Sequence, residues 1–232
     1  ARVLTMDEPT ASVSQHEAAA LFRVIKELSD RGVSIIYISH RLGEVKELAD
    51  RVVVLRDGEN AGELQRDQIT HDAMVKLMVG RDLVVNRGGR QSRTDVSPVQ
   101  DGAAETTCTT LAPPLTVHGL RTLANPTHEL NFSLQSGEIV GVAGLVGAGR
   151  TEVLRALFGI DRPAGGDIRV NGQTLALSSP RDAICAGIAL VPEDRKHQGV
   201  ILEMAVRENT ADAYWRFSKH SNEEATRTAA PA

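Results

Sequence analysis

The sequence predicts an α/β fold in which short buried strands alternate with amphipathic helices. Two β-prone runs, Val3–Met6 and Val33–Ile38, flank a predicted helix over residues 15–31, whose apolar residues recur every three or four positions. A third buried strand is predicted at residues 52–55, and a Gly-rich connection joins strand to helix within residues 139–158. This rhythm is typical of a mainly parallel sheet covered by helices.

The rest of the first part continues this alternation. Residues 41–49 are predicted to form a short helix between the second and third strands. Asp57-Gly58 predicts a hairpin into residues 60–64, because this pair readily adopts the positive φ of tight turns. Residues 67–78 are predicted to form one helix.

The second part shows the same kinds of element. The predicted strands occupy residues 115–117, 130–134, 139–143, 167–170, 173–177 and 188–191. A helix is predicted over residues 151–158, after the Gly-rich connection. Another begins at Ser179–Asp182, where Ser is the cap, Pro takes the first helical position and Asp follows three residues after the cap.

A polar segment separates the two parts. Residues 80–112 are rich in Gly, Ser, Thr, Asp, Arg and Gln, and this stretch is too long for a loop inside one compact domain. We therefore divide the chain into residues 1–82, a flexible linker at 83–112, and residues 113–232. Because the chain opens without Met and within a few residues of a strand, we expect an internal fragment of a longer protein.

The composition narrows the class of protein. With 41% hydrophobic and 24% charged residues, the chain is typical of a globular protein. The net charge of −4 comes without a basic stripe, which argues against nucleic acid as a partner. Cys108 and Cys185 lack the spacing of metal ligands or of a disulfide framework. No apolar run approaches the ~20 residues that cross a bilayer, so any membrane role is peripheral.

Two adjacent carboxylates, Asp7 and Glu8, directly follow the first predicted strand. Ligands of open α/β sheets gather at the carboxyl ends of strands, and buried carboxylates need a charge partner. Mg²⁺ together with phosphate is such a partner. We predict that Asp7 reaches the metal, and that Glu8 polarises the water attacking a γ-phosphate. The alternative is an ordinary acidic loop after a strand.

His40 ends the next predicted strand, 32 residues after Glu8. Neighbouring parallel strands place such residues at the same sheet edge, where a histidine contacts a γ-phosphate or holds the attacking water. By itself His40 would more simply be a capping or surface histidine. Because two carboxylates are expected at the same sheet edge, we predict that His40 has a catalytic role beside Glu8.

The Gly-rich connection at Gly144–Thr151 reads GLVGAGRT, which fits the phosphate-loop pattern with Arg in place of Lys. Its backbone N–H groups and the following helix N-terminus favour phosphate, and Thr151 would give its hydroxyl to Mg²⁺. The predicted nucleotide-binding residues here are Gly144, Gly147, Ala148, Gly149, Arg150 and Thr151.

Two other interpretations apply to this loop. A dinucleotide site is excluded, because the position that requires a third glycine holds Glu152. A Gly-rich turn without a ligand is the simpler alternative. Arg150 retains phosphate binding, but the exchange for Lys is not conservative, since Arg is larger, planar and bidentate.

These motifs resemble those of ABC ATPases. Residues Leu4–Thr10 resemble the Walker B segment, Ala11–Ser14 loosely resemble the D-loop, and Ile38–Arg41 resemble the switch-histidine loop. Glu193, within Val191–Lys196, stands where the family's Q-loop glutamine belongs. The segments at residues 141–152 and 179–182 also resemble the second cassette of two-cassette monosaccharide importers of the ribose, xylose and galactose type.

The resemblance implies P-loop NTPase sheets from two partial cassettes. Residues 1–82 would be the C-terminal part of a first cassette, and residues 113–232 the N-terminal part of a second. It implies an ATPase that uses ATP and Mg²⁺ to drive sugar import. The implied partners are membrane permease subunits and, indirectly, an extracytoplasmic sugar-binding protein. The implied location is peripheral, at the cytoplasmic face of the membrane.

In this family cassettes pair head to tail, which implies that the site residues belong to two ATP molecules. Asp7, Glu8 and His40 would serve one, and the phosphate loop with Glu193 the other. We therefore expect these residues not to converge and the isolated chain not to turn over ATP. Two alternatives remain: a non-transport regulatory module that binds ATP, and a circularly permuted single cassette in which residues 1–80 complete residues 113–212.

Overall fold

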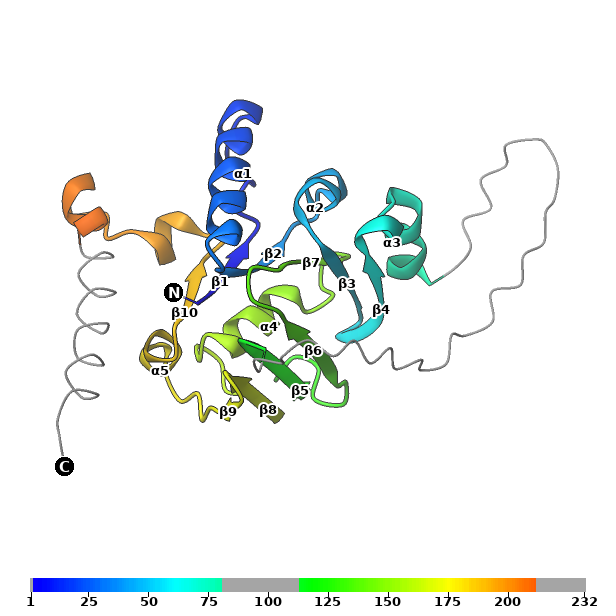
Figure 1. The fold of residues 1–232 in the computed structure, drawn as a ribbon. Helices are drawn as coiled ribbons and strands as arrows, with labels where there is room; N and C mark the ends of the chain where they lie inside the picture. Colours follow the sequence, from blue (N-terminus) through cyan, green and yellow to red (C-terminus); the bar gives the residue numbers. More distant parts are fainter. Residues whose placement is uncertain (1, 81–112, 212–232) are drawn as a thin grey trace.

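The computed structural model describes residues 2–80 and 113–211 (Figure 1). The linker predicted at residues 83–112 and Cys108 lie outside the described residues. Within the described ranges, no helix is both long and apolar enough to span a membrane.

The central sheet has six strands in the order β10-β1-β2-β7-β3-β4. Its strands are β1 (Val3–Asp7), β2 (Ser34–Ile38), β3 (Arg51–Arg56), β4 (Glu59–Gln65), β7 (Ile139–Gly144) and β10 (Ile188–Val191). Neighbouring strands pair in parallel, except for the antiparallel hairpin of β3 and β4. Asp7 pairs with Ile38, and Ile38 pairs with Val142, so β1, β2 and β7 end at one edge.

Both parts of the chain contribute to this one sheet. Strand β7, from the second part, lies between β2 and β3 of the first, and β10 pairs with β1. The predicted α/β P-loop fold class is confirmed. The assignment of the parts to a first and a second cassette remains a prediction, but here they complete one sheet, as the permuted alternative requires.

Three helices cover one face of this sheet, and their ends follow local signals. Helix α1 (Gln15–Asp30) begins with a capping box between Ser14 and Glu17. Helix α2 (Leu42–Leu48) follows β2. The helix predicted at residues 67–78 is instead a 3₁₀ turn, Arg66–Gln68, followed by α3 (His71–Val79). The break occurs because the Thr70 side chain accepts a hydrogen bond from the Ala73 N–H and so starts a new helix.

The opposite face carries helix α4 (Arg150–Leu157) and a second, antiparallel sheet. That sheet has the order β6-β5-β8-β9, with β5 (Leu115–Arg121), β6 (Leu130–Leu134), β8 (Gly165–Val170) and β9 (Gln173–Thr174). Strand β9 is shorter than its predicted range. Helix α5 (Pro180–Cys185) precedes β10, and a π-helical turn, Arg195–Gly199, follows it. Apolar residues of α4 pack with both sheets in one buried cluster.

Polar contacts as well as apolar packing join the two parts of the chain. Arg51 on β3 forms an ion pair with Glu138 of the second part at 2.9 Å. The Asp50 carboxylate accepts a hydrogen bond from the Ile139 N–H at 2.9 Å. The Ser34 hydroxyl donates to a second-part carbonyl, that of Gln135, at 2.7 Å. These contacts fix the register of β7 within the sheet.

Candidate functional site

The phosphate loop follows β7 and opens helix α4. Gly147 and Gly149 have φ of 83° and 87°, a left-handed conformation in which glycine is much the least strained residue. A Cβ atom on Gly144 would lie 2.7 Å from the Leu55 carbonyl oxygen, so this position has no room for a side chain. Ala148 is buried. The loop thus has the backbone geometry that turns successive N–H groups toward an anion.

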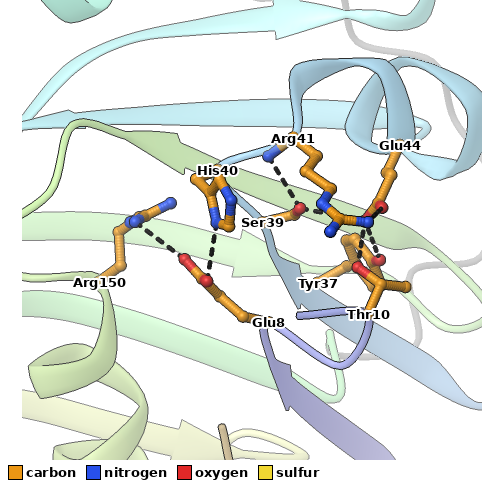
Figure 2. A network of polar contacts seen from close by, with 8 residues as sticks. All are labelled: Glu8, Thr10, Tyr37, Ser39, His40, Arg41, Glu44 and Arg150. Carbon is orange, nitrogen blue, oxygen red and sulfur yellow. Dashed lines mark hydrogen bonds and ion pairs between the residues drawn. The ribbon is translucent and has the colours of Figure 1, made fainter. Parts of the chain in front are cut away.

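Arg150 is the first residue of α4, and it is only 8% exposed. Its Nη2 donates to Glu8 Oε1 at 3.2 Å, although the two residues lie 142 positions apart (Figure 2). Its buried Nη1 has no hydrogen-bond partner among the described residues. A buried, charged donor without an acceptor is costly, and a phosphate oxygen would satisfy it.

Glu8 lies between Arg150 and His40 (Figure 2). Its second carboxylate oxygen, Oε2, is 2.8 Å from His40 Nδ1. The Glu8 backbone has a φ of 44°, which is unusual for a residue with a side chain, and its N–H donates to the Ile38 carbonyl at 3.0 Å. Strained backbone of this kind clusters at functional sites, where surrounding contacts maintain it.

Asp7 ends strand β1 and is 3% exposed. Burial raises the pKa of its carboxyl to about 6; the Thr151 hydroxyl opposes this rise, and the charges of Glu193 and Glu8 add to it. Its Oδ1 has no hydrogen-bond partner among the described residues. A buried carboxylate with an unsatisfied oxygen, next to a threonine hydroxyl, fits a hard divalent cation such as Mg²⁺.

A cavity of about 80 Å³ borders Asp7 and Thr151. Glu193 lines it, and so does Gln198 from the π-helical turn. In the described ranges, no cluster of three or more His, Cys, Asp or Glu side chains forms a ready-made metal cage. Where Mg²⁺ binds beside phosphates, one or two carboxylates usually hold it together with phosphate oxygens and water, and Asp7 with Thr151 would supply the protein ligands here.

Comparison with known proteins agrees with these motifs. The family model described as "ABC transporter" matches residues 127–230. The Ribose import ATP-binding protein RbsA of Rhodopirellula baltica is 40% identical over 218 residues, which cover 90% of this chain and 39% of that protein. RbsA 2 of Escherichia coli O157:H7 is 44% identical over 222 residues, covering 92% of this chain and 40% of that protein.

The chain belongs to the ABC transporter ATPase family. A further relative is the "Putative ribose/galactose/methyl galactoside import ATP-binding protein 3" of Agrobacterium fabrum. It is 42% identical over 208 residues, which cover 90% of this chain and 38% of that protein. The chain therefore spans about two fifths of the length of these ABC relatives. No solved structure matches it.

The ABC motifs of both parts meet at one sheet edge. The expectation that Asp7, Glu8 and His40 lie apart from the phosphate loop is wrong in this structure, because β7 pairs directly with β2. Glu193 lies near Asp7, in the wall of the same cavity. Which residues act in catalysis and which bind ATP and Mg²⁺ stays a prediction.

Two polar residues near the ABC motifs were not among those predicted. Gln198 lines the cavity beside Asp7, five positions after Glu193. The signal that would have found it is the glutamine itself, which lies soon after a predicted strand and close to Glu193. Glu44 lies beside the switch-histidine loop. Its position four residues after His40, at the start of a predicted helix, was the available signal.

The buried Asp7 predicts a pH-dependent stability. Its pKa is raised from 3.8 to about 6 in the folded chain, so the folded state binds this proton more tightly than the unfolded state does. Stability contributed by the protonated group is therefore lost as the pH rises through about 4 to 6. We expect Asp7→Asn to raise the free energy of unfolding by about 1–3 kcal/mol at pH 8 without metal, and little at pH 4.

Urea unfolding in EDTA at both pH values measures this difference. Asp30→Asn, which replaces an exposed aspartate at the end of α1, is the control and should change stability little at either pH. An Asp7→Asn variant that is no more stable than the parent at pH 8 would contradict the burial cost assigned to this carboxylate.

Proposed function

We propose that this chain binds Mg²⁺–ATP at one site built from both parts, and that it belongs to an ABC-type ATPase subunit that couples hydrolysis to carbohydrate import. One observation carries the proposal. The Arg150 guanidinium at the phosphate loop contacts Glu8 in the Walker B segment, which in turn contacts His40. Residues that the family uses on a single nucleotide thus lie within hydrogen-bond reach of one another.

Each side chain has a defined task in this proposal. Loop N–H groups and the Arg150 guanidinium bind the phosphates, while Asp7 and Thr151 hold Mg²⁺. The bound metal would neutralise charge on the phosphate oxygens. Glu8 orients the attacking water and accepts its proton, and His40 fixes the Glu8 carboxylate through the 2.8 Å contact.

The transport role rests on the relatives, whose names specify ribose import or ribose, galactose and methyl galactoside import. By this likeness, we propose that the chain acts with membrane permease subunits at the cytoplasmic face, and indirectly with an extracytoplasmic sugar-binding protein. Uptake of labelled ribose, xylose or galactose by the intact transporter in vesicles tests this role, and uptake that proceeds equally without ATP would contradict it.

Nucleotide binding is tested on the chain itself. A fluorescent ATP analogue is titrated into the protein with Mg²⁺ and, separately, with EDTA. We expect binding that Mg²⁺ strengthens, and we expect Asp7→Asn to remove most of that strengthening because the metal loses its protein carboxylate. Asp30→Asn should bind as the parent does. A parent chain that does not bind the analogue under either condition refutes the proposed function.

A further inference from the structure

Glu44, on α2, is the acceptor of a converging set of hydrogen bonds (Figure 2). Its Oε2 accepts from the hydroxyls of Thr10 at 2.6 Å, Tyr37 at 2.8 Å and Ser39 at 3.1 Å. Its Oε1 accepts from Arg41 Nη1 at 3.3 Å. The Glu44 side chain is 13% exposed, so these contacts form largely out of water, where bonds to a carboxylate are strong.

Three of these four donors lie in the two loops that carry the predicted catalytic pair, and Tyr37 lies in β2. Thr10 lies two residues after Glu8, and Ser39 and Arg41 flank His40 in the sequence. Thr10 and Ser39 are each 1% exposed. Through these donors one carboxylate ties the Walker B loop to the switch-histidine loop. This tie adds to the direct contact between Glu8 and His40.

Two details indicate that the Tyr37 and Ser39 hydroxyls donate their protons toward Glu44. Burial and the neighbouring Glu44 raise the pKa of the Tyr37 hydroxyl, so that this group keeps its proton and remains a donor. The Ser39 hydroxyl oxygen also accepts a hydrogen bond from the Arg41 N–H at 3.0 Å, which orients its own proton toward Glu44. The Glu44 carboxylate can only accept, so it is the acceptor that the three hydroxyls share, and this shared acceptor favours one arrangement of the loops.

The fold does not need this carboxylate to place α2. Val45 and Leu48 are 0% and 2% exposed, and they pack into two separate apolar clusters under the helix. Removal of the Glu44 side chain beyond Cβ is expected to leave α2 docked by these residues. Its main effect then falls on the two loops, which lose their common acceptor.

We propose that Glu44 is a positioning residue: acting through Thr10 and Ser39, it holds Glu8 and His40 in the arrangement that the attack of water requires. This role rests on the proposed function, since it concerns the same site. Glu44 does not contact the phosphate loop in this structure, so its effect on nucleotide affinity should be small, in contrast to that of Arg150.

The test reads the Glu8–His40 contact directly in the full chain. The ¹⁵N chemical shifts of the His40 imidazole report whether Nδ1 is hydrogen-bonded, and Glu8→Ala supplies the reference for the broken contact. We expect Glu44→Ala to shift the His40 signal toward this reference. Glu47→Ala, which changes an exposed glutamate on the same helix, should leave the signal at the parent position.

Two further measurements separate positioning from general damage. The affinity for the ATP analogue in Glu44→Ala should stay within about twofold of the parent, because Glu44 is not among the contacts of the phosphate loop and Glu8 keeps its charge beside Arg150. A general loss of fold would instead lower affinity and disturb all histidine signals together. If Glu44→Ala does not fold, the double variant Thr10→Val and Ser39→Ala removes two of the hydroxyls that donate to Glu44. This double variant should produce the same His40 shift.

A folded Glu44→Ala chain, or a folded Thr10→Val and Ser39→Ala chain, with an unchanged His40 signal would overturn the proposal. The histidine signal is measured without nucleotide, so it decides the role of Glu44 in holding the pair even if the parent fails to bind the ATP analogue. Failure of binding would refute the proposed function alone, and an unchanged His40 signal would refute the positioning role alone.

Discussion

Arg150→Ala is expected to weaken binding of the Mg²⁺–ATP analogue by about 10- to 100-fold. This loss corresponds to the roughly 1.5–3 kcal/mol of a hydrogen bond between charged partners. Arg150 is the buried cation at the phosphate loop, and its Nη1 has no acceptor within the described part of the chain. Arg150→Lys keeps the charge and should lose less affinity, although it cannot bind phosphate in a bidentate manner. Equilibrium titration measures all three proteins.

A second substitution tests whether Arg150 and Glu8 share one site. In the free chain Glu8 competes with phosphate for the Arg150 guanidinium, at 3.2 Å. Glu8→Gln removes that competing charge, so we expect it to tighten binding several-fold in the parent and to have little effect in the Arg150→Ala background. Equal effects of Glu8→Gln in both backgrounds would show that the two residues are not coupled. That result would mean that Arg150 and Glu8 act in separate sites.

Gly141→Val is expected to be strongly destabilising, lowering the free energy of unfolding by about 3 kcal/mol or preventing folding. Gly141 lies in β7, and an added Cβ would lie 2.6 Å from Val45 Cγ1 and 3.0 Å from the Ala49 Cβ. Both atoms belong to the first part of the chain, next to or within α2. The new side chain would force β7 and α2 apart, in the middle of the shared sheet.

Gly43→Ala is the matched control for this test. Gly43 lies within α2, and an added Cβ there would meet no described atom within 4 Å apart from its chain neighbours and the backbone of its own helix. We expect it to stabilise the chain by about 0.5–1 kcal/mol, because alanine favours a helix over glycine. Chemical unfolding of both variants measures the contrast. A Gly141→Val chain as stable as the parent would mean that the first part does not pack on β7.

Several features of this protein could be predicted from its sequence because they depend on neighbouring residues. Hydrophobic periodicity located most strands and helices, and the capping residues Ser14 and Ser179 lie at helix starts. The phosphate loop needs glycines at fixed positions after a strand, so its pattern is local as well. Helix α3 shows where such reasoning is weaker: the periodicity spans residues 67–78, but a single hydroxyl, that of Thr70, sets the start.

The site residues were identified by type and spacing, but their convergence was not predictable in that way. Strand order depends on hydrogen bonds and packing between segments far apart in the chain, and no local pattern specifies that β7 lies between β2 and β3. The same insertion places Arg150 beside Glu8. Glu44 gains its partners only when α2 lies beside the loops after β1 and β2.

Sequence alone thus determined the chemistry available to this protein: an α/β fold, carboxylates after a strand, a histidine after the next and a phosphate loop with arginine. The tertiary structure decided that these groups form one site, with Glu8 held between Arg150 and His40. The physical reason is that backbone conformation and helix caps are set within a few residues, whereas the pairing of strands is set by the packing of the whole sheet.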